Sequence, residues 1–203
     1  MCGRFQLNYS IDKIIDNYSY IRELELISSM EKGEKFPSDE ILIINQEFKA
    51  TGAKWGFPLY GKLLINARAE TLLNKDMFKD LVKNQRCIIP ANYFYEWKNE
   101  KGKKIKHKIF LKGKEVFSMA GLYKKIKLVD GSEKLSVVII TTEPNREIRE
   151  LHHRMPAILD KDKELLWLSK ECSEEEALSI LTPYRDNGLS ISQDIDFEQL
   201  SLI

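Results

Sequence analysis

The sequence predicts an α+β fold in which a mainly antiparallel, curved and barrel-like β core is flanked by helices. Strand-like segments follow one another through the middle of the chain, and helical periodicity appears near both ends. The 203 residues and the 43% apolar content suit one domain with an ordinary hydrophobic core. We therefore expect a single domain over residues 1–203, with no internal repeat or linker.

Helical spacing comes first along the chain, where apolar residues recur every three to four positions over residues 11–30, with Asp12 in the first turn. A short helix over residues 76–83 would place Met77, Phe78 and Leu81 on one side. Two more helices are predicted in the last third, over residues 161–169 and 173–181.

Strand patterns dominate the centre of the chain. Turn signals at Asn99-Glu100-Lys101-Gly102 and at Asp130-Gly131 separate consecutive strands, which predicts antiparallel hairpins. The predicted strands cover residues 40–45, 63–66, 86–89, 93–97, 105–111, 116–123 and 135–142.

Composition narrows the class of protein. The longest apolar runs have the length of strands, which argues against a membrane span. The first residues lack the apolar segment of a secretory signal, so we expect a cytoplasmic protein. The three cysteines, Cys2, Cys87 and Cys172, are odd in number and widely spaced, which does not suit a disulfide framework.

Charge is unevenly distributed, although the net charge is only +1. Residues 98–114 contain eight lysines and one acid, and residues 171–198 contain eight acids and one arginine. A basic segment can follow a phosphate backbone. A solvated hairpin tip explains the lysines equally simply, so this pattern alone does not identify a partner.

Cys2 has a distinctive chemistry if Met1 is removed, as is usual before a small residue. The residue then carries a free α-amine and a thiol. The amine, with an ordinary pKa near ~8, can form an imine with an aldehyde, and the sulfur can close a five-membered thiazolidine. Alternatively, the thiol alone can attack an acyl carbon with the amine as its base. A small terminal residue without a role is the third interpretation.

Three further segments combine groups suited to catalysis. Asn66-Ala67-Arg68-Ala69-Glu70-Thr71 holds an amide, a guanidinium and a carboxylate just after an apolar strand. In Tyr93-Phe94-Tyr95-Glu96-Trp97, strand alternation places Glu96 beside Phe94 and opposite the other aromatic residues. A carboxylate among aromatic rings tends to have a raised pKa, which suits a general acid or base, although a surface acid on an edge strand is also possible. Leu151-His152-His153-Arg154-Met155-Pro156 is the third segment, and no paired spacing among the cysteines and histidines indicates a metal site.

These motifs together resemble the SOS-response-associated peptidase (SRAP) family. The resemblance runs from Cys2 to about Asp160, and its collinear motifs, one of them tied to the second position of the chain, are highly specific. The matching segments are Met1-Cys2-Gly3-Arg4-Phe5, Trp55-Gly56, Asn66-Ala67-Arg68-Ala69-Glu70-Thr71, Arg86-Cys87-Ile88-Ile89-Pro90, Phe94-Tyr95-Glu96-Trp97 and His152-His153-Arg154-Met155-Pro156.

The resemblance implies a role for each catalytic candidate. Cys2 is the expected nucleophile, and Asn66 is expected to hydrogen-bond near its α-amine. Glu96 would move protons during imine formation and ring closure. His152 would protonate the sugar ring oxygen and help expose the C1′ aldehyde.

The resemblance also implies contacts with DNA. Arg4 and Arg68 are expected to hold phosphates beside the lesion. Trp55 could stack on a base or lie in the core, and Arg154 could bind phosphate or pair internally.

The function implied is covalent capture of abasic sites in single-stranded DNA through a thiazolidine at Cys2, which would shield the lesion in the DNA damage response. Autoproteolytic and lyase activities are also associated with the family. We expect a monomer without metal or cofactor. The alternatives are an N-terminal-nucleophile cysteine peptidase and a DNA-binding module without chemistry.

Two departures from the family pattern concern DNA binding rather than the catalytic candidates. Glu34-Lys35-Phe36-Pro37 stands where family chains usually carry an Asn-x-x-Pro segment, so the DNA-facing wedge differs here. The family's Pro-Val-Ser-like final strand has its nearest match at Ser190-Ile191-Ser192.

Overall fold

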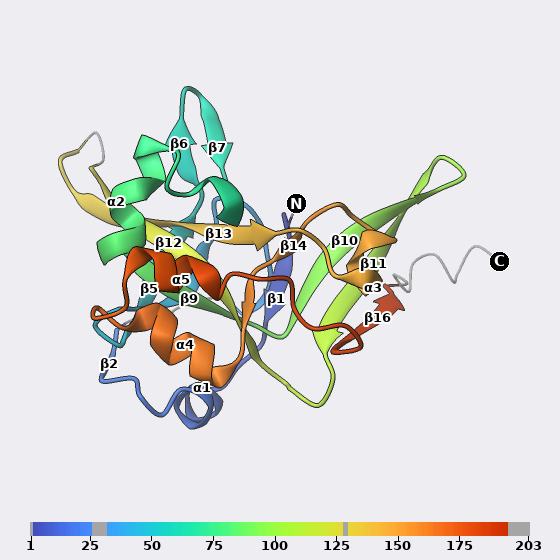
Figure 1. Cartoon of the computed structure of the whole chain (residues 1–203), viewed down its shortest axis with the longest axis horizontal. Helices are drawn as coiled ribbons and strands as arrows, with labels where there is room; N and C mark the ends of the chain where they lie inside the picture. Colours follow the sequence, from blue (N-terminus) through green and yellow to red (C-terminus); the bar gives the residue numbers. More distant parts are fainter. Residues whose placement is uncertain (1, 26–31, 128–129, 195–203) are drawn as a thin grey trace.

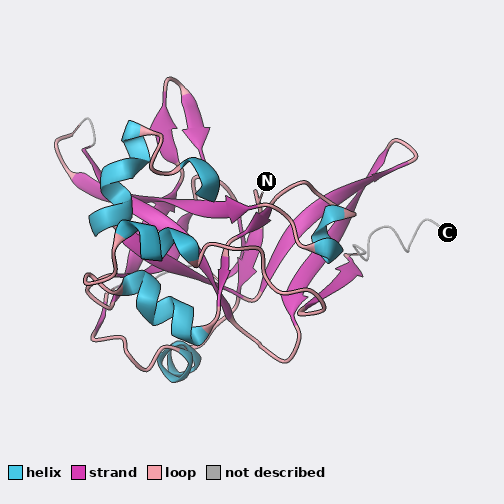
Figure 2. Cartoon of the chain, viewed as in Figure 1, coloured by secondary structure: helices cyan, strands magenta, loops and turns pink. Residues whose placement is uncertain are grey.

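A computed structural model describes residues 2–25, 32–127 and 130–194 as a β-rich fold with helices on its outside (Figure 2). Two sheets account for most of the described strands, and a small hairpin of β6 (Phe57–Leu59) and β7 (Lys62–Leu64) lies apart from them. This arrangement confirms the predicted α+β class with its mainly antiparallel β core.

The larger sheet closes into a barrel. Its strands follow the order β13-β12-β9-β4-β5, and β5 pairs back to β13 in parallel, with Ser136 opposite Lys54 and Val137 opposite Trp55. The other neighbours in the ring are antiparallel. The barrel strands are β4 (Glu40–Asn45), β5 (Lys49–Trp55), β9 (Arg86–Ala91), β12 (Phe117–Lys127) and β13 (Glu133–Thr142).

Four short strands attach to this ring. β8 runs parallel to β13, and β14 pairs with the same strand in antiparallel fashion. They place the segments that carry Asn66 and His152 along one end of β13, which matters for the site. The attached strands are β2 (Glu23–Leu24), β8 (Asn66–Arg68), β14 (Met155–Pro156) and β15 (Ile158–Leu159).

The second sheet has five strands in the order β16-β11-β10-β1-β3 and lies beside the barrel (Figure 1). Its long hairpin of β10 and β11 turns at Lys101 and Gly102, which have positive φ angles of 49° and 82° and so form the left-handed turn that the sequence predicts. The strands are β1 (Phe5–Leu7), β3 (Gly33–Lys35), β10 (Tyr93–Glu100), β11 (Lys103–Leu111) and β16 (Leu189–Gln193).

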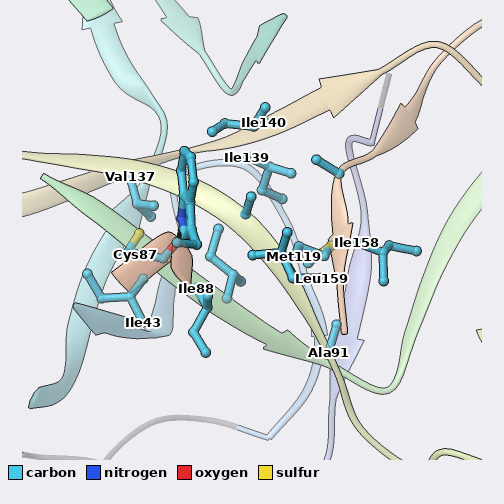
Figure 3. Close-up of a cluster of buried hydrophobic side chains, with 14 of the residues drawn as sticks. Ile43, Cys87, Ile88, Ala91, Met119, Val137, Ile139, Ile140, Ile158 and Leu159 are labelled. Carbon is cyan, nitrogen blue, oxygen red and sulfur yellow. Dashed lines mark hydrogen bonds between the residues drawn. The ribbon is translucent and has the colours of Figure 1, made fainter. Parts of the chain in front are cut away.

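The hydrophobic core fills the barrel (Figure 3). Strand residues that point inward are branched aliphatics, which pack well on pleated strands. Ile43, Ile88 and Ile139 are fully buried there, and Met119 and Leu159 pack beside them.

Within the described residues, five α-helices lie outside the sheets: α1 (Ile11–Asn17), α2 (Asp76–Asn84), α3 (Arg146–Arg149), α4 (Lys161–Leu168) and α5 (Glu174–Ser179). Those predicted over residues 76–83, 161–169 and 173–181 are confirmed within two residues. None of the described helices has the length and apolar character needed to cross a membrane.

The helix predicted over residues 11–30 is wrong beyond Asn17. The backbone N–H of Arg22 donates to the Phe48 carbonyl, and Glu25 donates to Ala50, both at 2.9 Å, so the chain forms β2 along β5 instead. Tertiary pairing overrides the local periodicity here. Residues 26–30 of the prediction lie outside the described residues.

Candidate active site

The segment before β1 lies where the five-stranded sheet meets the barrel (Figure 1). Cys2 is fully buried there, and its thiol points toward the Arg4 carbonyl oxygen at 3.9 Å. The next strand over is β10, in which Phe94 lies opposite Phe5. Because β1 and β10 are antiparallel, their pairing places Cys2 near the part of β10 that contains Glu96.

Asn66 connects Cys2 to the barrel. Its Nδ2 donates a hydrogen bond of 2.9 Å to the Cys2 carbonyl oxygen, and its position opposite Ile139 in the β8–β13 ladder fixes its backbone. Asn66 Oδ1 is buried and has no hydrogen-bond partner among the described residues. A buried acceptor without a donor costs about 1–3 kcal/mol, so it indicates a place prepared for another group.

Glu96 lies on the inner side of β10, as the predicted strand alternation requires. Only 3% of it is exposed, and Phe94 beside it is fully buried. Burial raises the pKa of the Glu96 carboxyl to about 7. The surface-acid interpretation is therefore wrong, because β10 is an interior strand between β1 and β11. A carboxyl with this pKa can both donate and accept a proton near neutral pH.

His152 reaches the same place from the segment between α3 and β14. Its Nδ1 lies 3.9 Å from Glu96 Oε1. Partial burial is the main cause that lowers the pKa of His152, so the ring is neutral at pH 7.

The neighbouring backbone selects the His152 tautomer. Nδ1 lies 3.0 Å from the backbone N of Arg154 and 3.2 Å from its carbonyl oxygen, and these contacts need opposite tautomers. The N–H can only donate, so an accepting Nδ1 satisfies it and leaves the ring proton on Nε2. His153 stacks on this ring at 4.2 Å between centroids.

The Cys2 thiol is protonated in this environment. Burial is the largest cause that raises its pKa well above the ordinary value, and the nearby Glu96 carboxylate adds to the increase. The sulfur is therefore a poor first nucleophile at neutral pH. It needs a base before it can react.

Arg154 pairs internally, which is one of the two roles that the sequence left open. Its guanidinium donates two parallel hydrogen bonds to Glu70, at 2.9 and 2.8 Å, and a third of 2.6 Å to the Thr141 carbonyl oxygen. Only 8% of Arg154 is exposed. The fork holds the backbone that contacts His152.

Trp55 belongs to the core. The residue is fully buried, its Nε1 donates to the Ile65 carbonyl oxygen at 3.1 Å, and its ring meets Phe5 edge-on at 5.2 Å between centroids. The expectation that it stacks on a base is corrected, because neither ring face is accessible. The core interpretation, which the sequence also allowed, describes it.

Arg4 lies at the rim of the site among aromatic rings. Its guanidinium is 4.3 Å from the centroid of Phe36 and 5.1 Å from that of Trp97. Glu34 faces it at 3.6 Å and is also paired with Lys106. The acid that distinguishes this chain from the family pattern is thus neutralised by two cations.

Arg68 is exposed at the end of β8 and lines an open groove of about 480 Å³ together with His153 and Arg154. The groove adjoins the site through His153, which stacks on His152. The structure therefore gathers Cys2, Asn66, Glu96 and His152 in one place and puts Arg68 beside them.

Two residues at the site were given no role by the sequence. Glu70 binds Arg154 across 84 positions of the chain, a pairing that leaves no local signal. Trp97 is part of a quoted motif, but only the alternation of β10 could have shown that its ring lies on the outer face with Arg4. In the described residues, no three histidine, cysteine or acidic side chains are grouped so that they could hold a metal ion.

Comparisons with known proteins show the family to which this chain belongs. The family model described as "SOS response associated peptidase (SRAP)" matches residues 1–195. The abasic site processing protein YoaM of Bacillus subtilis is 39% identical over 95% of this chain and 90% of its own length. The abasic site processing protein HMCES of Gallus gallus is 31% identical over 58% of this chain and 42% of its own length.

A solved structure of a protein from Bacteroides thetaiotaomicron superimposes with a TM-score of 0.86 at 26% identity, over 98% of this chain and 94% of that one. The fold, the match to almost the whole family model and the identity to YoaM lead to one conclusion. The chain belongs to the SOS response associated peptidase (SRAP) family.

Proposed function

We propose that this protein captures abasic sites in single-stranded DNA by forming a thiazolidine between Cys2 and the C1′ aldehyde of the lesion, after removal of Met1. One observation carries the proposal: four segments far apart in sequence bring Cys2, Asn66, Glu96 and His152 together. The names of the relatives, abasic site processing proteins, favour an abasic lesion as the substrate.

The protonation states favour attack by the amine before the thiol. The Cys2 thiol is held protonated, whereas an α-amine with a pKa near ~8 is partly neutral at pH 7. Asn66 Oδ1, which lacks a partner among the described residues, is the acceptor that would orient this amine. His152 would donate its Nε2 proton to the sugar ring oxygen as the ring opens to the aldehyde.

The reaction balances without a co-reactant. The Cys2 nitrogen bonds to C1′, the carbonyl oxygen leaves as water, and an imine results. The sulfur then adds to C1′ while its proton is transferred to the imine nitrogen, with Glu96 as the carrier. The product is a five-membered ring, and one water is released in total.

The alternative, a cysteine peptidase, needs the thiolate as its first nucleophile. Burial of Cys2 and the adjacent Glu96 both raise the thiol pKa, which opposes that order of events. This observation favours the imine route.

The proposal is tested by mixing the protein with a single strand that carries one abasic site. We expect a DNA–protein adduct that survives a denaturing gel. The same strand without the lesion should give no adduct. Equal adduct with both strands, or none with either, would reject the proposed function.

Replacing Asn66 with alanine should slow capture by about tenfold, which corresponds to ~1.4 kcal/mol of lost transition-state stabilisation. The variant loses both the hydrogen bond to the Cys2 carbonyl and the acceptor for its amine. The rate is read from a time course of adduct formation, with thermal unfolding as the check on folding. A wild-type rate would show that this amide does not orient the amine.

Arg68→Ala should weaken binding of single strands and make it less dependent on salt. A lost phosphate contact lowers the slope of log K against log salt by about 0.7. Arg22→Ala is the matched control, because Arg22 is also exposed but lies over Phe48, away from the groove. Identical salt titrations for the two variants would remove Arg68 from the DNA contacts.

A further inference from the structure

The groove at Arg68 continues beyond the site. His153 and Arg154, which contact His152, line it next to the catalytic candidates, and Pro144 and Arg149 line it as well. Arg149 is exposed and belongs to α3, so the groove leads from the site to this helix.

A second open groove of about 580 Å³ begins at the same two residues, Pro144 and Arg149. It is lined further along by Arg146, which lies one turn away on α3, and by Arg185 on the opposite wall. The two grooves therefore form one continuous path, and arginine side chains line it along its length.

These arginines are available for a ligand. All four are exposed, and within the described residues none takes part in an ion pair of 4.0 Å or less, in contrast to Arg154. Two acids also line the path, Glu143 and Asp186, which leaves an excess of positive charge. The four arginines are Arg68, Arg146, Arg149 and Arg185.

The far wall is fixed before any ligand arrives. Asp186 Oδ1 accepts a hydrogen bond of 2.9 Å from the backbone N–H of Arg146, and Glu147 accepts one of 3.0 Å from that of Asn187. These bonds tie the turn that carries Arg185 to α3. A preorganised wall loses little conformational freedom on binding.

We infer that this path, which we call the α3 groove, binds the phosphates of the DNA strand on one side of the abasic site. The inference rests on the proposed function for the identity of the strand. Guanidinium groups hold phosphates through paired hydrogen bonds, and a row of them suits a polyanion that passes the site and continues outward. A single phosphate would need only one of the four.

The test compares two double variants that remove the same charge from a helix. Arg146→Gln with Arg149→Gln alters the α3 groove, and Lys79→Gln with Lys83→Gln alters exposed positions of α2, at the opposite end of the molecule (Figure 1). Binding of a labelled lesion-free single strand is followed by fluorescence anisotropy across a salt series, so capture is not required.

We expect the arginine variant to bind on the order of tenfold more weakly, with a salt slope lower by about 1.4 for two lost contacts. The lysine variant should bind like the wild type. Equal losses in the two variants, or no loss in either, would overturn the inference. Displacement of the strand by poly-glutamate at equal charge would overturn it in favour of an acidic protein partner.

Adduct formation with very short abasic strands distinguishes failure of this inference from failure of the proposed function. With one nucleotide on each side of the lesion, the arginine variant should form adduct at the wild-type rate, whereas a strand extended on one side should show the defect. If wild-type protein captures no strand of any length, the proposed function fails, and the anisotropy result still decides whether the α3 groove binds DNA.

Discussion

Replacing Cys2 with alanine should abolish the durable adduct while leaving a reactive amine. Alanine at the new N-terminus can still form an imine with the C1′ aldehyde, but it has no sulfur to close the ring. The imine is reversible and can lead to strand cleavage by β-elimination. We therefore expect nicked DNA and no cross-link on a denaturing gel after incubation with an abasic strand.

Cys2→Ser provides the matched control because it nearly keeps the size of the side chain and replaces the thiol with a hydroxyl group. It should also fail to give a stable sulfur-containing ring. Reduction with borohydride should trap the imine of either variant as a stable amine. A durable adduct formed by Cys2→Ala without reduction would show that the sulfur is not part of the linkage.

Glu96→Gln and His152→Ala should slow capture by about 10²–10⁴-fold, the usual contribution of a general acid–base group. Glutamine keeps the shape of Glu96 but cannot carry a proton from the Cys2 sulfur to the imine nitrogen. The wild-type rate should pass through a maximum near pH 7, since burial raises the Glu96 pKa to about 7. Single-turnover rates from pH 5 to 9 measure this, and a wild-type rate for Glu96→Gln at every pH would exclude proton transfer by Glu96.

Glu96→Gln should also stabilise the protein above neutral pH, because it removes a buried carboxylate whose pKa is raised by desolvation. The unfolded carboxyl titrates near 4.5 and the folded one near 7, so the folded state binds its proton more tightly between these values. The free energy of unfolding therefore falls as pH rises from about 4.5 to 7, by up to about 3 kcal/mol. Urea unfolding measures this. The free energy of unfolding of the variant, relative to that of the wild type, should be larger at pH 8 than at pH 4.

Sequence periodicity predicts the long, buried strands best. β9, β12 and β13 are barrel strands with long runs of buried residues, and their predicted bounds lie within four residues of the observed ones. β1 and β3 have three residues each, too few to show a period. β5, which closes the barrel, was not predicted, because Lys49, Gly52 and Lys54 interrupt the apolar pattern of a strand.

The catalytic candidates were all identified from sequence, but their arrangement was not. Motifs name Cys2, Asn66, Glu96 and His152, yet it is the β1–β10, β8–β13 and β13–β14 pairings that bring their segments together. The sequence motifs also give Trp55, Arg68 and Arg154 as possible DNA contacts, and burial shows which of them are accessible. Trp55 lies in the core and Arg154 is held by Glu70, whereas Arg68 remains exposed.

The thiazolidine mechanism requires that both the amine and the thiol of Cys2 bond to the lesion. Intact mass spectrometry of the cross-linked complex measures this directly. The predicted mass is that of the chain without Met1 plus the abasic strand minus one water, with the DNA located on Cys2 after digestion. A second preparation with an N-terminal extension keeps the nitrogen in an amide, and it should form no adduct even though its thiol is intact. Efficient cross-linking by protein that demonstrably retains Met1 would contradict the thiazolidine mechanism.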